Sequence, residues 1–195
     1  MLFTLIGLGL IILFLVAFYR LRSKAQDEFL ENYNFPKMII EKFKKKHPSL
    51  SDEDIALVIK GLKNYFYISS HSSDIVIMPS IVLDDLWHEF LLYTKEYESF
   101  SLNAFGHFFH HSPNDTKLFD VDMARFLAWE KSCELEELSP SQTSKLPLIF
   151  EIDKLLNIKD GLHYDVTKEK YWYNKYLKKL EEERQSSCGG GCGCG

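Results

Sequence analysis

Residues 51–66, SDEDIALVIKGLKNYF, carry the clearest local pattern in the chain. The segment opens with Ser51-Asp52-Glu53-Asp54, a pattern typical of a capping box at a helix N-terminus. Behind it, apolar side chains recur at three- and four-residue spacing and predict one buried stripe of an α-helix: Ile55, Val58, Ile59, Leu62, Tyr65 and Phe66. Similar spacing continues on both sides, without a convincing strand pattern or an internal repeat. The sequence therefore predicts an all-α fold.

Turn and capping residues divide the rest of the chain into further helices. Pro36 is placed to open one helix, Ser80 can cap another, and an extended piece at 75–78 precedes Ser80. Ser112-Pro113 and Ser139-Pro140-Ser141 are typical of the ends of helices and of loops. Helices are predicted at about 36–46, 51–66, 80–100, 104–111, 114–138, 146–156 and 167–184.

The N-terminal segment, residues 1–19, contains no charged side chain. As a helix it would be roughly 28 Å long, close to the thickness of a bilayer core. Arg20, Arg22 and Lys24 follow it, which is the reverse of the order in a cleaved signal peptide. The sequence therefore predicts a single-pass anchor in the cytoplasmic (inner) membrane, with the N-terminus outside and the C-terminal domain in the cytoplasm.

Charge is divided along the chain and suggests four regions. The 195 residues hold 23 Lys and Arg against 28 Asp and Glu, a net charge of −5, so we expect no nucleic-acid partner. Residues 20–46 are locally basic, with eight basic and four acidic side chains, and could contact anionic headgroups or form an ordinary solvated helix face. The predicted regions are an anchor at 1–19, basic juxtamembrane helices at 20–50, a helical domain at 51–184 and a disordered Cys/Gly-rich tail at 185–195.

Three of the four cysteines, Cys188, Cys192 and Cys194, lie in this tail. In a reducing compartment they would be free thiols or ligands of a soft metal, and their spacing matches no familiar zinc finger. Soft-metal or redox chemistry and a disordered tail with incidental thiols both remain open. The fourth, Cys133, has apolar neighbours on a predicted helix, which favours buried packing over nucleophilic chemistry.

Asp84, His88, His107 and His111 form the strongest candidate metal site. Asp84 and His88 are four residues apart on one predicted helix, and His107 and His111 are four apart on the next. If the two helices pack antiparallel, these four side chains could bind zinc or another first-row divalent metal. A purely structural histidine cluster remains the alternative. Because the sequence contains no complete catalytic motif, we predict no catalytic residue.

The same stretch resembles the glycine-rich domain-containing protein-like family, and most nearly its bacterial, membrane-anchored branch. The residues that carry the resemblance are Asp84, Trp87, His88, Tyr97, Gly106 and His110. It extends to residues 145–153 and 160–164 and to the Cys/Gly-rich tail, whereas Ser101 stands where that family usually has cysteine. The resemblance implies a fold and a membrane topology, and no established reaction.

Three functions are consistent with these patterns. We expect a non-enzymatic interaction or scaffold module that holds a protein partner at the inner leaflet. The alternative is a metal-binding protein that uses the Asp/His cluster, with the tail thiols handing metal over. A metal-dependent hydrolase, with Asp85 or Glu89 as the base, has the least support.

Overall fold

The computed structural model describes residues 2–111 and 119–189, with side chains described for 7–111 and 119–186. Within these ranges the chain forms eight helices and no strand, which confirms the all-α fold. The helices are α1 (Leu2–Asn32), α2 (Lys37–Lys46), α3 (Asp52–Ser70), α4 (Ile81–Leu91), α5 (Thr94–Phe105), α6 (Val121–Leu135), α7 (Leu148–Leu155) and α8 (Val166–Gly189).

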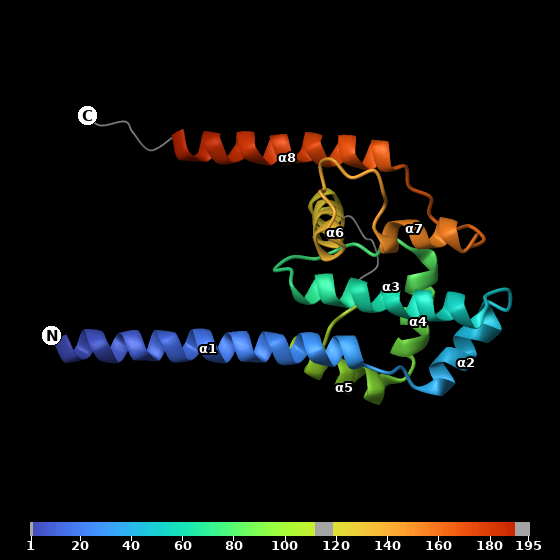
Figure 1. Ribbon diagram of the computed structural model, residues 1–195, viewed down its shortest axis with the longest axis horizontal. Helices are drawn as coiled ribbons and strands as arrows, with labels where there is room; N and C mark the ends of the chain where they lie inside the picture. Colours follow the sequence, from blue (N-terminus) through green and yellow to red (C-terminus); the bar gives the residue numbers. More distant parts are fainter. Residues whose placement is uncertain (1, 112–118, 190–195) are drawn as a thin grey trace.

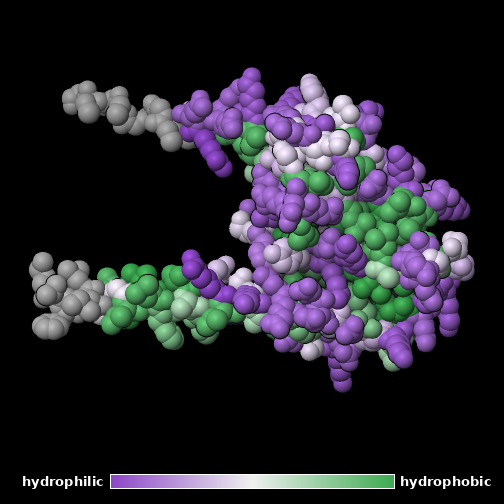
Figure 2. Space-filling model, viewed as in Figure 1, coloured by the Kyte–Doolittle hydropathy of each residue, from purple (hydrophilic) through white to green (hydrophobic). Residues whose placement is uncertain are grey.

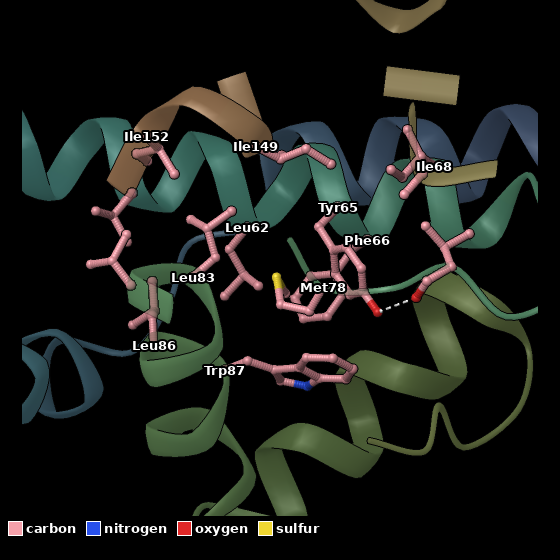
Figure 3. Packing of buried hydrophobic residues seen from close by; sticks show 14 of the residues in the cluster. Leu62, Tyr65, Phe66, Ile68, Met78, Leu83, Leu86, Trp87, Ile149 and Ile152 are labelled. Atoms are coloured by element: carbon pink, nitrogen blue, oxygen red, sulfur yellow. Dashed lines mark hydrogen bonds between the residues drawn. The ribbon is translucent and has the colours of Figure 1, made fainter. Parts of the chain in front are cut away.

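Helix α3 lies at the centre of the fold and contacts α1, α4, α6 and α7 (Figure 1). The capping box predicted at its start is present: the Asp54 N–H donates to Ser51 Oγ at 3.1 Å, and the Ser51 N–H donates to the Asp54 carboxylate at 2.9 Å. The predicted apolar stripe faces the core, where it packs on α4 and α7. Figure 3 labels the side chains that meet there: Leu62, Tyr65, Phe66, Leu83, Leu86, Trp87, Ile149 and Ile152.

The helix predicted at 80–100 is two helices, α4 and α5, because the chain turns at Leu92 and Tyr93. The Tyr93 N–H donates to the Phe90 carbonyl at 3.0 Å and closes the turn. After it, α5 folds back so that the rings of Phe90 and Phe100 pack with centroids 5.2 Å apart. A straight helix would carry these two rings about 15 Å apart along its axis. Burial of both rings in one core therefore accounts for the break.

The structure of helix α1 does not support the predicted membrane anchor. No helix in the described ranges is long and apolar enough to cross a membrane. Helix α1 continues past its apolar residues through charged ones to Asn32. The predicted single-pass inner-membrane location, with its orientation, was therefore wrong, and the anchor at 1–19 and the membrane as a partner are unsupported.

Helix α8 packs on α6 and then continues beyond the domain, on the same side as α1 (Figure 1). The rings of Phe126 and Tyr173 stack with centroids 4.8 Å apart, and Tyr173 Oη–H donates to Glu130 at 2.8 Å. The helix runs to Gly189, so the disordered tail expected from residue 185 is not confirmed. The side chain of Cys188 and all of Cys192 and Cys194 lie outside the described residues, as do residues 114–118 of the helix predicted at 114–138.

Candidate functional site

The start of α4 positions the first two residues of the site. Ser80 Oγ accepts the Leu83 N–H at 3.2 Å, so α4 begins at the predicted cap. Asp84 therefore lies in the first turn and His88 one turn later, on the same face of the helix. Asp84 Oδ2 and His88 Nδ1 are 3.4 Å apart. This i,i+4 pair was correctly predicted from the spacing.

The helix predicted at 104–111 is wrong, because the segment that follows α5 is not helical. Helix α5 ends at Phe105, and Gly106 takes the left-handed conformation, with φ 77°, that favours glycine at a helix C-terminus. The chain then returns over α4 without helical structure up to His111. The predicted i,i+4 relation between His107 and His111 on one helix face is therefore wrong.

A buried tyrosine holds this returning segment against α4. Trp87 Nε1–H donates to the Tyr97 hydroxyl at 3.1 Å, and that hydroxyl donates in turn to the Phe109 carbonyl. Burial raises the pKa of Tyr97 to about 12, so its hydroxyl keeps the proton that it donates. The Phe109 ring also stacks on the indole of Trp87, with centroids 5.5 Å apart. These contacts fix the backbone immediately before His111.

His111 consequently reaches Asp84 from a segment 27 residues later in the chain. Its Nε2 lies 2.8 Å from Asp84 Oδ1, within hydrogen-bond distance. The imidazole also packs on Trp87 and His88, with ring centroids 4.3 and 4.5 Å away. The side chain of His111 is 16% exposed, whereas that of His88 is 50% exposed. One of the two imidazoles is thus largely covered and the other faces solvent.

This arrangement satisfies the first requirements of a metal site. One ligand atom from each of Asp84, His88 and His111 lies within 4.8 Å of the other two. Tetrahedral ligands about 2.1 Å from a zinc ion lie about 3.4 Å from one another, so only small side-chain movements are needed. Without a metal, Asp84 also holds the cluster together through its hydrogen bond with His111 and its contact with His88, so the structural interpretation accounts for the geometry as well.

The other predicted site residues lie apart from this cluster. His107 and His110 are exposed, and their rings lie beside those of Phe105 and Phe108. Asp85, one of the two proposed hydrolytic bases, instead pairs with Lys46 and His47. Its oxygens are therefore engaged with the end of α2 and do not join Asp84.

A cavity of about 610 Å³ opens beside the cluster. Asp84, His88 and His111 form part of its wall, and His107 and His110 line it as well. Tyr65 Oη–H donates to the Val76 carbonyl at 3.0 Å and fixes the extended segment opposite, as the dashed line in Figure 3 shows. Burial raises the pKa of this tyrosine above its ordinary value. The candidate ligands thus face a space of the size that small-molecule sites occupy.

Sequence reasoning missed a buried carboxylate that sets the position of α4. Asp153, on α7, is 1% exposed and accepts four hydrogen bonds, from Ser80 Oγ and from the backbone N–H groups of Ile81, Val82 and Leu162. The first three donors belong to the start of α4, the element that carries Asp84. The local signal of this role was weak, because the mainly apolar run 148–156 also contains Glu151 and Lys154.

Comparisons with known proteins assign the chain to a family. Residues 25–190 match the UCP032817-like family, whereas no curated protein and no solved structure matches the chain. Nothing links the matched family to the glycine-rich domain-containing proteins, so the resemblance inferred from Asp84, Trp87, His88, Tyr97, Gly106 and His110 pointed to the wrong family. The match covers the helical domain and every residue of the candidate site, and the chain belongs to the UCP032817-like family.

Proposed function

We propose that the chain binds one first-row divalent metal ion, such as zinc, through Asp84, His88 and His111. The observation that carries the proposal is the convergence of the three ligand atoms within 4.8 Å on the wall of a cavity. His111 comes from a different segment and is held there by the Trp87–Tyr97 contact. Three protein ligands leave at least one coordination position open, which suits a metal that also binds a small molecule.

Metal binding is tested with the full-length chain, stripped of metal and dialysed against Co²⁺ or Zn²⁺. We expect about one equivalent per chain. The variant His111→Ala should weaken binding by at least about 100-fold, the upper end of the range for loss of an outer-shell partner, because it removes a ligand itself. Elemental analysis and the visible spectrum of bound Co²⁺ give both quantities.

His107→Ala is the matched control, because His107 is also an imidazole of the cavity wall but lies outside the cluster. It should retain the stoichiometry of the unmodified chain. A chain that binds no metal, or a His111→Ala variant with unchanged affinity, would contradict the proposal. Loss of metal in His107→Ala but not in His111→Ala would favour a different ligand set.

A second candidate function, an interaction module, is supported by the exposed apolar surface of α1. Much of the described part of this helix is green and exposed in Figure 2. The large side chains of α1 that face solvent are Leu8, Leu10, Ile11, Ile12, Leu13, Phe14, Leu15, Val16, Phe18, Tyr19 and Leu21. Contiguous apolar surface of this extent is typical of interaction sites. The partner that we propose is a second copy of the chain, because self-association would cover the same apolar surface on both molecules.

Self-association is tested by sedimentation of the full-length chain. We expect an oligomer that Leu13→Lys shifts toward monomer, because a charge on this surface opposes its burial. Leu155→Lys, at an exposed leucine of α7, is the matched control and should leave the distribution unchanged. A chain that is monomeric at every concentration, or equal effects of the two variants, would contradict this second proposal.

A further inference from the structure

The cavity beside the candidate metal site has both apolar and polar side chains in its lining. The apolar ones include Met78, Phe105 and Phe109, and the rings of the two phenylalanines stack with centroids 4.2 Å apart. The polar ones include Ser72 and Ser73, whose hydroxyls can form hydrogen bonds. A ligand that fills this space would therefore contact apolar side chains over much of its surface and hydrogen-bond at one edge.

The charges of the described lining restrict how an anion could be held. The lining includes the carboxylates Asp74 and Asp84 but no lysine or arginine among the residues that the structure describes there. The other described donors there include serine hydroxyls and the imidazoles of His107 and His110, so a bound metal would be the strongest positive centre that this lining offers an anion. A divalent ion held by Asp84 and two neutral imidazoles carries a net charge of about +1, which a single negative charge balances.

These features favour a monocarboxylate over phosphate as the bound anion. Phosphate approaches a double negative charge near pH 7 and needs several strong donors, which are usually arginine, lysine or a group of backbone N–H groups. Asp74 would repel it further, and the apolar part of the lining offers no hydrogen-bond partner to its oxygens. A monocarboxylate needs only one positive centre, and an apolar body attached to it gains from contact with the phenylalanine wall.

We propose that the open coordination position takes the carboxylate of a small organic acid, whose apolar body packs against Phe105 and Phe109. This inference rests on the proposed metal site and specifies what that site binds. It requires the carboxylate to replace water on the metal, with no bond of the acid broken. A polar edge of the ligand would find hydrogen-bond partners in the lining serines, such as Ser72 and Ser73.

The inference is tested with the full-length chain loaded with Co²⁺, titrated with benzoate, acetate and inorganic phosphate. We expect benzoate to change the Co²⁺ spectrum saturably and to bind at least about 10-fold more tightly than acetate, because burial of an apolar ring adds more than about 1.4 kcal/mol. Phosphate should bind more weakly than benzoate.

Two variants examine the apolar wall. Phe105→Leu should bring benzoate affinity toward that of acetate without changing acetate affinity. Ile75→Ser removes an apolar side chain that lines the cavity and is 45% exposed, so it should lower benzoate affinity without opening the core. Leu102→Ala lies on α5 but not on the cavity, and it serves as the control that should change nothing.

The outcomes separate the two proposals. A chain that binds no Co²⁺ fails the proposed function, whereas a chain that binds Co²⁺ but responds to no carboxylate fails only this inference. Equal affinity for acetate and benzoate would overturn the proposed packing of an apolar body against Phe105 and Phe109. Tighter binding of phosphate than of benzoate would overturn the choice of a monocarboxylate.

Discussion

Replacing Asp153 by alanine is expected to lower the free energy of unfolding by about 3–5 kcal/mol, a large part of the 5–15 kcal/mol typical of a domain. The carboxylate is 1% exposed and accepts four hydrogen bonds. Its loss would leave the buried N–H group of Val82 and the half-buried N–H groups of Ile81 and Leu162 without their acceptor. The urea dependence of helical circular dichroism gives the change.

The asparagine variant distinguishes loss of the charge from loss of side-chain volume. Oδ1 of Asp153 accepts from Ser80 and Val82, and Oδ2 accepts from Ile81 and Leu162. An amide would turn one of these oxygens into an NH₂ group that faces two donors. Asp153→Asn should therefore still cost about 2 kcal/mol or more, although it preserves the shape of the side chain.

Glu151→Ala is the matched control for this prediction. Glu151 is acidic, lies on the same helix α7, and is exposed, so its loss should cost less than about 1 kcal/mol. Equal effects of Glu151→Ala and Asp153→Ala would contradict the assigned role. Because Asp153 positions the start of α4, and α4 carries Asp84, metal affinity measured on the folded Asp153→Asn variant should fall as well.

Local patterns predicted the parts of the fold that depend on neighbouring residues. The capping box at Ser51 and the cap at Ser80 were found because each involves residues three apart. The break between α4 and α5 was not found, because Leu92 and Tyr93 are not typical helix breakers and the turn depends on the packing of Phe90 against Phe100.

The candidate site was only partly predictable for the same reason. The pair Asp84–His88 follows from helical periodicity. His111 was assigned to the cluster through a helix that does not exist, and it reaches Asp84 because Tyr97 and Trp87 hold the returning segment. Asp153 lies more than 70 residues from Ser80, so no local pattern could connect them. Long-range hydrogen bonds, rather than periodicity, thus position the site.

The second large effect is expected at the ion pair that joins α8 to α6. Arg125 Nη2 donates to both carboxylate oxygens of Glu169 at 2.7 Å, and its guanidinium lies 4.5 Å from the ring centre of Trp172. The side chain of Glu169 is 5% exposed, whereas that of Arg125 is 32% exposed. Removal of the arginine therefore strands a buried charge, but removal of the glutamate leaves a cation that can still contact water.

Arg125→Met should consequently cost about 3–5 kcal/mol, and Glu169→Gln about 1–2 kcal/mol, because the amide oxygen still accepts a hydrogen bond. The double variant Arg125→Met/Glu169→Leu should lie closer to the unmodified protein than Arg125→Met does, because no charge remains buried. Urea unfolding gives these values, and limited trypsin digestion read by mass spectrometry shows whether cleavage begins within α8.

An exposed ion pair on the same helix provides the control. Lys178 and Glu182 lie 3.8 Å apart with side chains 77% and 66% exposed, so Lys178→Met should cost less than about 0.5 kcal/mol. A larger loss in Glu169→Gln than in Arg125→Met would mean that burial does not control the asymmetry. If Arg125→Met destabilises α8 alone, the cavity and the metal affinity should survive, because among the described helices α8 packs chiefly on α6 and the three candidate ligands lie on α4 and the segment after α5.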